Sequence, residues 1–236
     1  MSALTGVPAS AQSGTVQRMQ VTDLSDTVFA VTFTTASQRT ATVRYGTSPT
    51  RMSLTARNDR DVAAAGRTPV RSTVHRVTLL GLRNSTTYYF EPVVDGTAQP
   101  GQAGRPYRQT TAPQQPLRVP VRVHGTAVTS AGATPALGAV LVIGQWINPD
   151  GSRSDPVSVL SGAPSGGRGP AAYDLVPTLL TTNGRDPFTP DDSATFRVTA
   201  LADDRGHLVA GGPVSARRGL HITLMPLLRL AAPPRR

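Results

Sequence analysis

The four histidines are the residues of this chain that could most readily serve as bases or metal ligands. They stand at positions 75, 124, 207 and 221, and none is separated from another by the one or three residues that let two imidazoles reach one metal ion. His124 and His221 lie opposite apolar positions in alternating segments, so we expect both to face solvent. His75 is expected to have a structural role. The histidines therefore predict neither a catalytic base nor a metal site.

Acidic residues form a second group with chemical potential, because calcium prefers clustered carboxylate oxygens. They occur in four short stretches: residues 150–155, Asp186, Asp191-Asp192 and Asp203-Asp204. The first stretch lacks an alternating series of aspartates and contains Arg153. Aspartate also favours turns, because its side chain bonds to nearby backbone. Turn formation is the preferred interpretation, calcium binding stays the alternative, and no cofactor is predicted.

Motifs for covalent or phosphate chemistry are missing from the sequence. There is no Gly-x-Ser-x-Gly elbow, and a phosphate-binding loop of the Gly-Lys-Ser/Thr type is impossible without lysine. The glycine-rich residues 165–169 could cradle an anion, but no strand and helix flank them, so a surface loop is predicted. The chain has no cysteine, which excludes disulfides and thiolate nucleophiles. No catalytic residue is predicted, and the chain is not expected to be an enzyme.

Aromatic side chains could instead bind sugars by stacking. The chain has one tryptophan, Trp146, and few tyrosines in predicted loops, of which Tyr107 and Tyr173 are the best placed. Trp146 is therefore the candidate ligand contact. Carbohydrate-binding proteins usually display two or three exposed aromatic rings, and this chain has few aromatic residues that could be exposed.

The amino-acid composition indicates which secondary-structure elements carry these side chains. The chain has 22 glycines and 21 prolines, and all 24 of its basic residues are arginine. Glycine and proline suit turns, and without lysine a common residue of exposed helices is lost, so short strands are favoured. The net charge is +10, but the arginines are scattered from Arg18 to Arg236 and form no basic face. Nucleic-acid binding is therefore not predicted.

Apolar and polar residues alternate with period two in short runs, which predicts β-strands. In the first half the runs are residues 28–33, 41–45, 74–79, 86–94 and 105–111, and Asp95-Gly96 is a favoured hairpin turn pair. After a proline-containing linker at 112–116, further runs are residues 117–124, 138–143, 194–200 and 220–224. No helical stripe extends over ten positions. The pattern predicts an all-β chain of two consecutive antiparallel, immunoglobulin-like β-sandwiches, at 15–113 and 117–236, the second with a basic tail.

Residues 77–90 resemble the Leu-x-Gly-Leu-x-x-x-Thr-x-Tyr segment of fibronectin type III domains, with Leu82 and Tyr88 at the corner positions. In such a corner the tyrosine hydroxyl bonds to backbone a few residues upstream. Residues 40–49 and 75–79 are similar to the N-terminal domain of purple acid phosphatases, with Phe33 where such domains carry a core tryptophan. The catalytic domain of that family is separate and needs clustered Asp, His and Asn ligands, which are missing after Pro113.

Residues 134–142, 174–175 and 188–199 resemble bacterial carboxypeptidase-regulatory-like, or transthyretin-like, extracellular sandwiches. The segment 162–170 and the stretch 181–184 depart from the usual spacing. The resemblance implies a second β-sandwich, which the alternating runs also predict.

The first residues bear on location. Residues 3–11 are similar to the end of a secretory signal, with Ala9-Ser10-Ala11 as a cleavage box, although a flexible leader is the alternative interpretation of residues 1–14. No apolar run reaches the ~20 residues that a membrane span requires. A bacterial protein that is secreted or held at the cell surface is expected.

Three classes of function compete. The sequence favours a non-enzymatic structural or adhesion protein that contacts other copies of itself, extracellular matrix or polysaccharide. The alternative is a carbohydrate-binding accessory module associated with an extracellular hydrolase. An enzyme is the third class, which the missing catalytic constellation opposes.

Overall fold

The computed structural model describes residues 15–63, 68–114, 122–136, 138–162, 171–177, 179–182, 186–204, 207–217 and 222–232. The leader at 1–14, the glycine-rich stretch 165–169, His221 and the arginines at the C-terminus lie outside the described residues. Sixteen strands account for most of the described chain, with one short helix and one 3₁₀ turn. The prediction of an all-β fold is confirmed.

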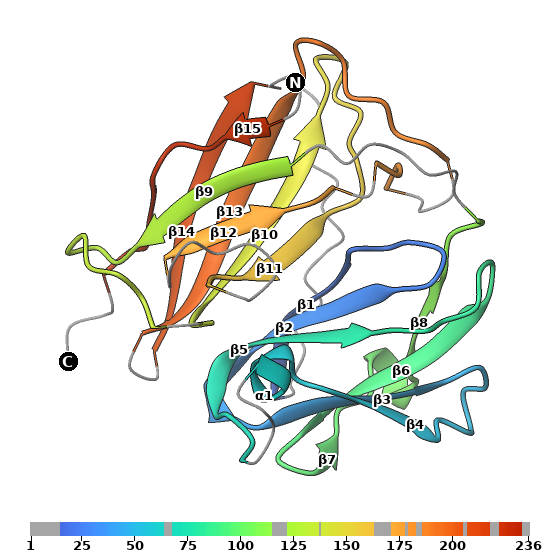
Figure 1. The fold of residues 1–236 in the computed structure, drawn as a ribbon. Coiled ribbons are helices and arrows are strands. Elements are labelled where there is room, and N and C mark those ends of the chain that lie inside the picture. The colour runs from blue at the N-terminus through green and yellow to red at the C-terminus, as the bar shows by residue number, and fades with distance from the viewer. Residues whose placement is uncertain are drawn as a thin grey trace.

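Strands β1 to β8 form two facing sheets (Figure 1). The three-stranded sheet has the order β1-β2-β5, and the five-stranded sheet has the order β4-β3-β6-β7 with β8 beside β6. All pairs are antiparallel. The strands are β1 (Val16–Thr22), β2 (Phe29–Arg39), β3 (Ala41–Gly46), β4 (Leu54–Arg57), β5 (Ser72–Leu79), β6 (Thr87–Val94), β7 (Thr97–Ala98) and β8 (Tyr107–Thr110). We call this part the first module.

The predicted runs lie on these strands because one side of each strand closes the core. Phe29, Val31 and Phe33 alternate along β2 and are buried together with Val77 of β5 and Phe90 of β6. The turn after β6 is formed by Asp95 (φ 45°) and Gly96 (φ 80°), which is the predicted hairpin pair. The connection from β4 to β5 contains α1 (Asp59–Ala63), and η1 (Gln102–Gly104) precedes β8.

Strands β9 to β16 form a second pair of sheets, which we call the second module (Figure 1). One sheet has the order β11-β10-β13-β14 and the other the order β12-β9-β15, with β16 also pairing β9. The strands are β9 (Arg122–Val128), β10 (Val140–Ile147), β11 (Val157–Leu160), β12 (Ala172–Leu175), β13 (Thr195–Asp204), β14 (His207–Arg217), β15 (Ile222–Leu224) and β16 (Leu228–Arg229). Strands β15 and β16 run parallel to β9, in contrast to the antiparallel pairs elsewhere.

The core of the second module is centred on large aromatic side chains. Trp146 and Phe196 pack edge to face with ring centroids 4.9 Å apart, and Tyr173 and Leu175 close the opposite side. Gly144 makes this packing possible, because a Cβ atom there would lie 2.3 Å from the Phe196 ring. Strand β8 ends at Thr110 and β9 begins at Arg122, and the predicted start of the second module at 117 lies outside the described residues.

Of the helices in the described residues, none has the length or the apolar character needed to cross a membrane.

Candidate functional site

Trp146, the predicted ligand contact, is part of the core. Its side chain has no exposed surface, and it lies on β10 against Phe196. The prediction of a surface stacking platform is therefore wrong at this position. Alternation explains the placement, because Val140, Val142 and Trp146 share the inward face of one strand.

Of the two tyrosines that could have accompanied Trp146, Tyr173 is buried and Tyr107 is half-buried. Tyr173 is 1% exposed and lies over Gly125, where a Cβ atom would come 2.3 Å from the tyrosine oxygen. Burial raises the pKa of Tyr173. Tyr107 stacks on Phe90 with ring centroids 5.7 Å apart. The described aromatic residues named from the sequence thus form no exposed platform.

The corner residues Leu82 and Tyr88 lie where the resemblance implied. The Tyr88 hydroxyl accepts a hydrogen bond of 2.9 Å from the backbone N–H of Arg83, five residues upstream. The backbone N–H of Leu82 donates to Thr27 across the end of the sandwich. Both side chains are at most 5% exposed. These two residues tie one end of the first module together.

His75 is buried between its neighbours and stacks on Phe33, with ring centroids 4.8 Å apart. Asn58 donates to Nδ1, and Nε2 lies 3.2 Å from the Thr35 hydroxyl. Burial, assisted by the positive charge of Arg60, lowers the pKa of His75 to about 4. The imidazole is therefore neutral near pH 7 and holds the core of the first module together.

The acidic stretches serve backbone turns and contacts between the modules. Asp150 accepts a hydrogen bond from the backbone N–H of Ser152 at 2.8 Å, as a turn-forming aspartate does. Asp203 accepts bonds from the backbone N–H of Thr73 and from Gln38, both in the first module. Within the described part of the chain, no three histidine or acidic side chains lie together where they could hold a metal ion.

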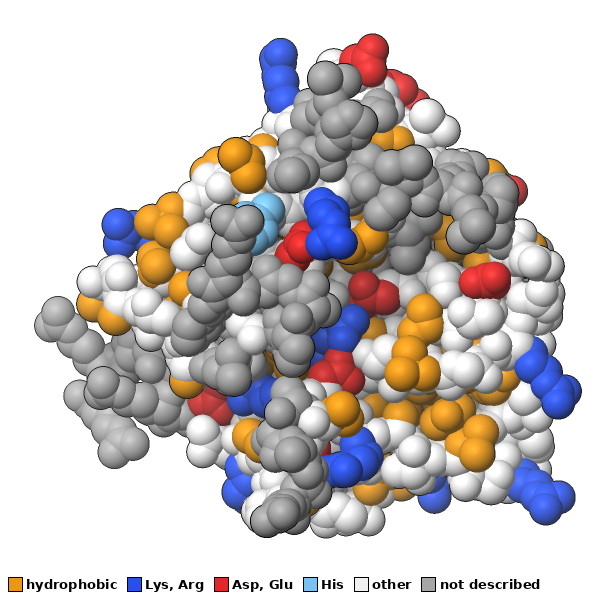
Figure 2. Space-filling model, in the orientation of Figure 1, with side chains coloured by type: hydrophobic (Ala, Val, Ile, Leu, Met, Phe, Trp, Pro, Cys, Tyr) orange, Lys and Arg blue, Asp and Glu red, His pale blue; other side chains and the backbone are white. Residues whose placement is uncertain are grey.

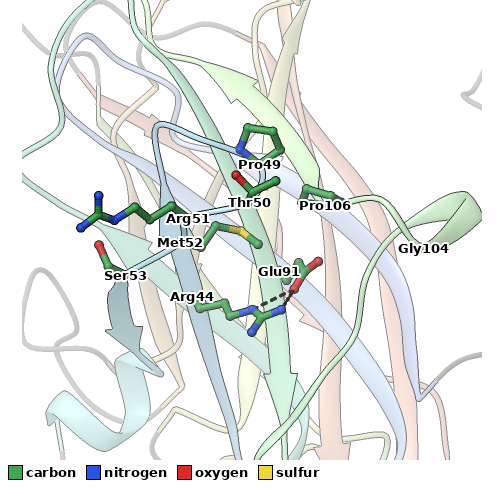
Figure 3. Close-up of a pocket in the computed structure, with 9 residues that line it drawn as sticks. All are labelled: Arg44, Pro49, Thr50, Arg51, Met52, Ser53, Glu91, Gly104 and Pro106. Carbon is green, nitrogen blue, oxygen red and sulfur yellow. Dashed lines mark hydrogen bonds and ion pairs between the residues drawn. The ribbon is translucent and has the colours of Figure 1, made fainter.

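The five-stranded sheet of the first module carries a pocket of about 460 Å³ (Figure 3). Its base is an ion pair between Arg44 of β3 and Glu91 of β6, which are register partners. One wall is the segment between β3 and β4, and the opposite wall is the segment that leads into β8. The lining residues are Arg44, Pro49, Thr50, Arg51, Met52, Ser53, Glu91, Gly104 and Pro106.

A network of largely buried charges joins the two modules. Arg76 of β5 lies between two carboxylates of its own module, Asp23 and Asp59, and also donates to the Ser158 hydroxyl of β11 at 2.8 Å. Asp23 accepts from both the backbone N–H and the hydroxyl of Ser158. Burial alone would lower the pKa of Arg76, but its two carboxylates outweigh burial and raise it. Arg76 is thus a permanent cation at the centre of the contact.

An apolar cluster lies beside this network. Val74 of β5 packs with Leu141 of β10 and Leu160 of β11, and all three are at most 5% exposed. Their partly buried neighbours are Ile143, Leu201 and Leu208. The three-stranded sheet of the first module therefore packs its outer face on the β11-β10-β13-β14 sheet of the second module (Figure 1).

Asp155 is a further carboxylate at this contact. Only 7% of the residue is exposed, and it directly precedes Pro156, whose carbonyl accepts a hydrogen bond from the backbone of Asp23. Burial, together with the negative charge of Asp23, raises the pKa of Asp155 to about 7. Asp155 therefore changes charge near neutral pH.

The pocket and the interface were not predicted from the sequence, although two signals pointed to the interface. Val74 lies out of phase with Val77 and Leu79, which face the core of the first module. Residues 140–143 are apolar without alternation, which is typical of a strand that is covered on both faces. For the pocket the one available signal was compositional, since Glu91 is the single glutamate of the chain.

Charged side chains of the described residues do not gather into one patch on the side of the molecule that Figure 2 shows. On the side of the molecule that Figure 2 shows, basic side chains lie apart from one another at the edges, and near the centre they lie beside acidic ones. The described residues in this view present no basic stripe.

Residues 16–111 match the model of the family "Purple acid Phosphatase, N-terminal domain". No curated protein matches the chain. Among solved structures, the match with the FN1-FN3 domains of chicken CNTN1 covers 92% of this chain and 67% of that chain, with 13% sequence identity and a TM-score of 0.26. The match with latent PorU of Porphyromonas gingivalis covers 89% of this chain and 20% of that chain, with 10% sequence identity and a TM-score of 0.29. The match with the pilus backbone RrgB of Streptococcus pneumoniae covers 91% of this chain and 84% of that chain, with 11% sequence identity and a TM-score of 0.26.

The family match covers the first module and stops before the second. It concerns the N-terminal, non-catalytic domain of the phosphatases, and its limits agree with β1 to β8. The strand order, the Tyr88 corner and this match together identify the first module as a fibronectin type III-like β-sandwich, similar to the N-terminal domain of purple acid phosphatases.

Proposed function

We propose that this chain is a non-enzymatic structural or adhesive protein, secreted or displayed at the cell surface, in which two β-sandwiches act as one rigid unit. The observation that carries the proposal is the buried contact between the modules. A flexible linker alone would let two domains reorient, because interfaces within one chain resemble transient ones unless they are well packed. Here charged, polar and apolar contacts all contribute to one interface.

A rigid pair of sandwiches suits a mechanical or display role. It holds the loops at its two ends at fixed positions, so that a surface-bound copy presents them at a constant distance. The family match supports the proposal, because it concerns a domain that does not carry the phosphatase chemistry.

Protease accessibility on intact native cells tests the location. We expect added proteinase K to remove the protein from intact cells, or the protein to be found in the culture medium, while a cytosolic marker stays intact. Protection of the protein until the cells are lysed would refute the surface role.

The adhesive role is tested separately with the purified chain. Cell-sized beads coated with the chain are expected to retain native cells or their matrix more strongly than beads coated with albumin. Equal retention on both kinds of bead, with surface display intact, would leave only the structural part of the proposal.

A further inference from the structure

The pocket on the five-stranded sheet has walls that are fixed by close backbone packing. Gly46 lets the segment 49–53 lie against β3, because a Cβ atom there would come 2.5 Å from the carbonyl oxygen of Arg51. On the other side, Gly101 lies against the Tyr107 ring, and its backbone N–H donates to the carbonyl of Arg105. Tyr107 is itself stacked on Phe90. The cavity is therefore a built feature of the fold.

The base of the pocket leaves hydrogen-bonding capacity unused. Both Nε and Nη2 of Arg44 donate to the same oxygen of Glu91, Oε2, where a forked pair would use both oxygens. No described residue donates to the other oxygen, Oε1, although the Glu91 side chain is only 6% exposed. Arg44 in turn keeps Nη1 without a partner among the described residues, and 44% of its side chain is exposed. The base thus keeps one acceptor and one donor available for a ligand.

The charge at the base excludes an anion as the preferred ligand. Glu91 neutralises Arg44, and the buried carboxylate would repel a phosphate or a carboxylate at the same place. The second arginine at the pocket, Arg51, extends its guanidinium away from the ion pair (Figure 3). The pair therefore fits a neutral group that can both donate and accept a hydrogen bond.

The walls add small apolar and hydroxyl groups. Met52 lies over the ion pair, Pro49 belongs to the segment between β3 and β4, and Pro106 belongs to the segment that leads into β8 (Figure 3). Thr50 and Ser53 contribute hydroxyls. A sugar ring matches this combination, since its hydroxyls both donate and accept while its C–H faces are apolar. The cavity volume lies within the usual range of about 300–1,000 Å³ for small-molecule sites.

We propose that this pocket is a binding site for a neutral saccharide, held by Oε1 of Glu91 and Nη1 of Arg44. The proposal goes beyond the structural role above, because the pocket can bind a sugar wherever the protein is located. It assigns saccharide recognition to the first module in place of the buried Trp146. Since no aromatic ring lines the pocket, weak, millimolar-range binding is expected.

Titration of the purified chain with cellobiose, maltose and N-acetylglucosamine, followed by NMR, tests the site. At least one of these sugars is expected to shift the backbone amides of residues 50–53 and 104–105. Glu91→Gln keeps the shape but removes the charge of the acceptor, and it should weaken binding by about tenfold or more, the loss of one hydrogen bond to a charged group. Met52→Ala leaves the ion pair intact and should weaken the same titration.

Arg122→Gln is the matched control. Arg122 pairs with Asp174 in the second module at 2.8 Å, and it too is an exposed arginine on a largely buried carboxylate. Sugar binding should not change in this variant. The proposal is overturned if none of the three sugars shifts the pocket amides, or if Glu91→Gln binds as well as the native chain. Stronger binding of inorganic phosphate, glucuronate or a trialanine peptide at these amides would overturn it as well.

Discussion

At the scale of single residues, local and long-range placement differ in how well the sequence predicts them. Leu82 and Tyr88 are separated by five residues, and their corner depends on contacts within one segment and its neighbours, so a sequence motif was sufficient to find it. The position of Trp146 depends on which face of β10 closes the core. A single aromatic in a short apolar run does not reveal that face, and the interpretation as a surface ring was wrong.

Replacing the corner hydroxyl should weaken the first module. Tyr88→Phe leaves the backbone N–H of Arg83 without its acceptor, at a cost of about 1–3 kcal/mol in the free energy of unfolding. Urea denaturation followed by tyrosine fluorescence measures the change. Tyr89→Phe is the control, because Tyr89 is the half-buried neighbour on the opposite side of β6, and it should change stability by less than about 0.5 kcal/mol.

Two buried groups make opposite contributions to the pH dependence of stability. The pKa of His75 is about 4 in the folded chain, below its ordinary value of 6.5, so unfolding takes up a proton between these values and stability rises with pH. The pKa of Asp155 is about 7, above its ordinary value of 3.8, so unfolding releases a proton and stability falls as pH rises from about 4 to 7. Between pH 4 and 6.5 the two effects oppose each other.

Asp155→Asn should separate these effects. Without the carboxylate, stability is expected to rise from pH 4.5 to 6.5, where the native chain changes less. Above pH 7 the variant should be more stable than the native chain, because it no longer buries a negative charge near Asp23. Melting temperatures measured at half-unit steps of pH check both statements. Parallel curves for the two proteins would contradict the assignment of Asp155.

At the scale of elements, alternation found the strands that have one buried face and one exposed face. Strands β3, β6 and β13 overlap the predicted runs, and so does β2, although β2 is buried on both faces from Phe29 to Thr35. Strand β14 was missed because Gly211, Gly212 and Pro213 interrupt it. The register shift there places two residues opposite Thr199, and Gly212 adopts a φ of 82°, as a bulge requires. The helix α1 was missed because five residues carry no helical period.

Gly144 is the position where one strand most depends on a missing side chain. Gly144→Ala would bring a methyl group 2.3 Å from Phe196 and 2.9 Å from Leu175, so β10 and β13 must shift or the ring must leave its rotamer. We expect a loss of about 1–3 kcal/mol in the second module. Thr199→Ala, on the exposed side of β13, should cost less than about 0.5 kcal/mol. Thermal unfolding followed by Trp146 fluorescence compares the two, and equal melting temperatures would show that the core adapts freely.

At the scale of the whole molecule, the contact between the modules decides how they are arranged. Its residues are far apart in the sequence, with Asp23 bonded to Ser158 and Thr73 bonded to Asp203. Periodicity within one segment cannot reveal such pairs. In the structure β5 and β10 are buried on both faces over much of their length. The sequence shows this only for β10, whose continuous apolar run at 140–143 is a sign of a covering layer but does not say which layer it is. Two sandwiches could therefore be predicted, but not their contact.

Removal of the central cation should loosen this contact. In Arg76→Ala, Asp23 and Asp59 lose their partner while still largely buried, which costs about 3 kcal/mol or more. The variant is expected to unfold in two transitions, to have a larger radius of gyration in solution scattering and to be cut by trypsin between residues 112 and 122. Arg122→Ala also leaves a largely buried carboxylate, Asp174, without its arginine, but it lies outside the contact, so the radius of gyration and the trypsin resistance should stay native. If Arg76→Ala keeps the native radius and trypsin resistance, Val74, Leu141 and Leu160 hold the modules together without the charges. If the contact does loosen, a triple variant with Asp23→Asn and Asp59→Asn added to Arg76→Ala shows the cause. Recovery of the native radius in this variant would assign the loosening to the unpaired carboxylates, and a radius that stays large would assign it to the loss of the bonds that Arg76 donates.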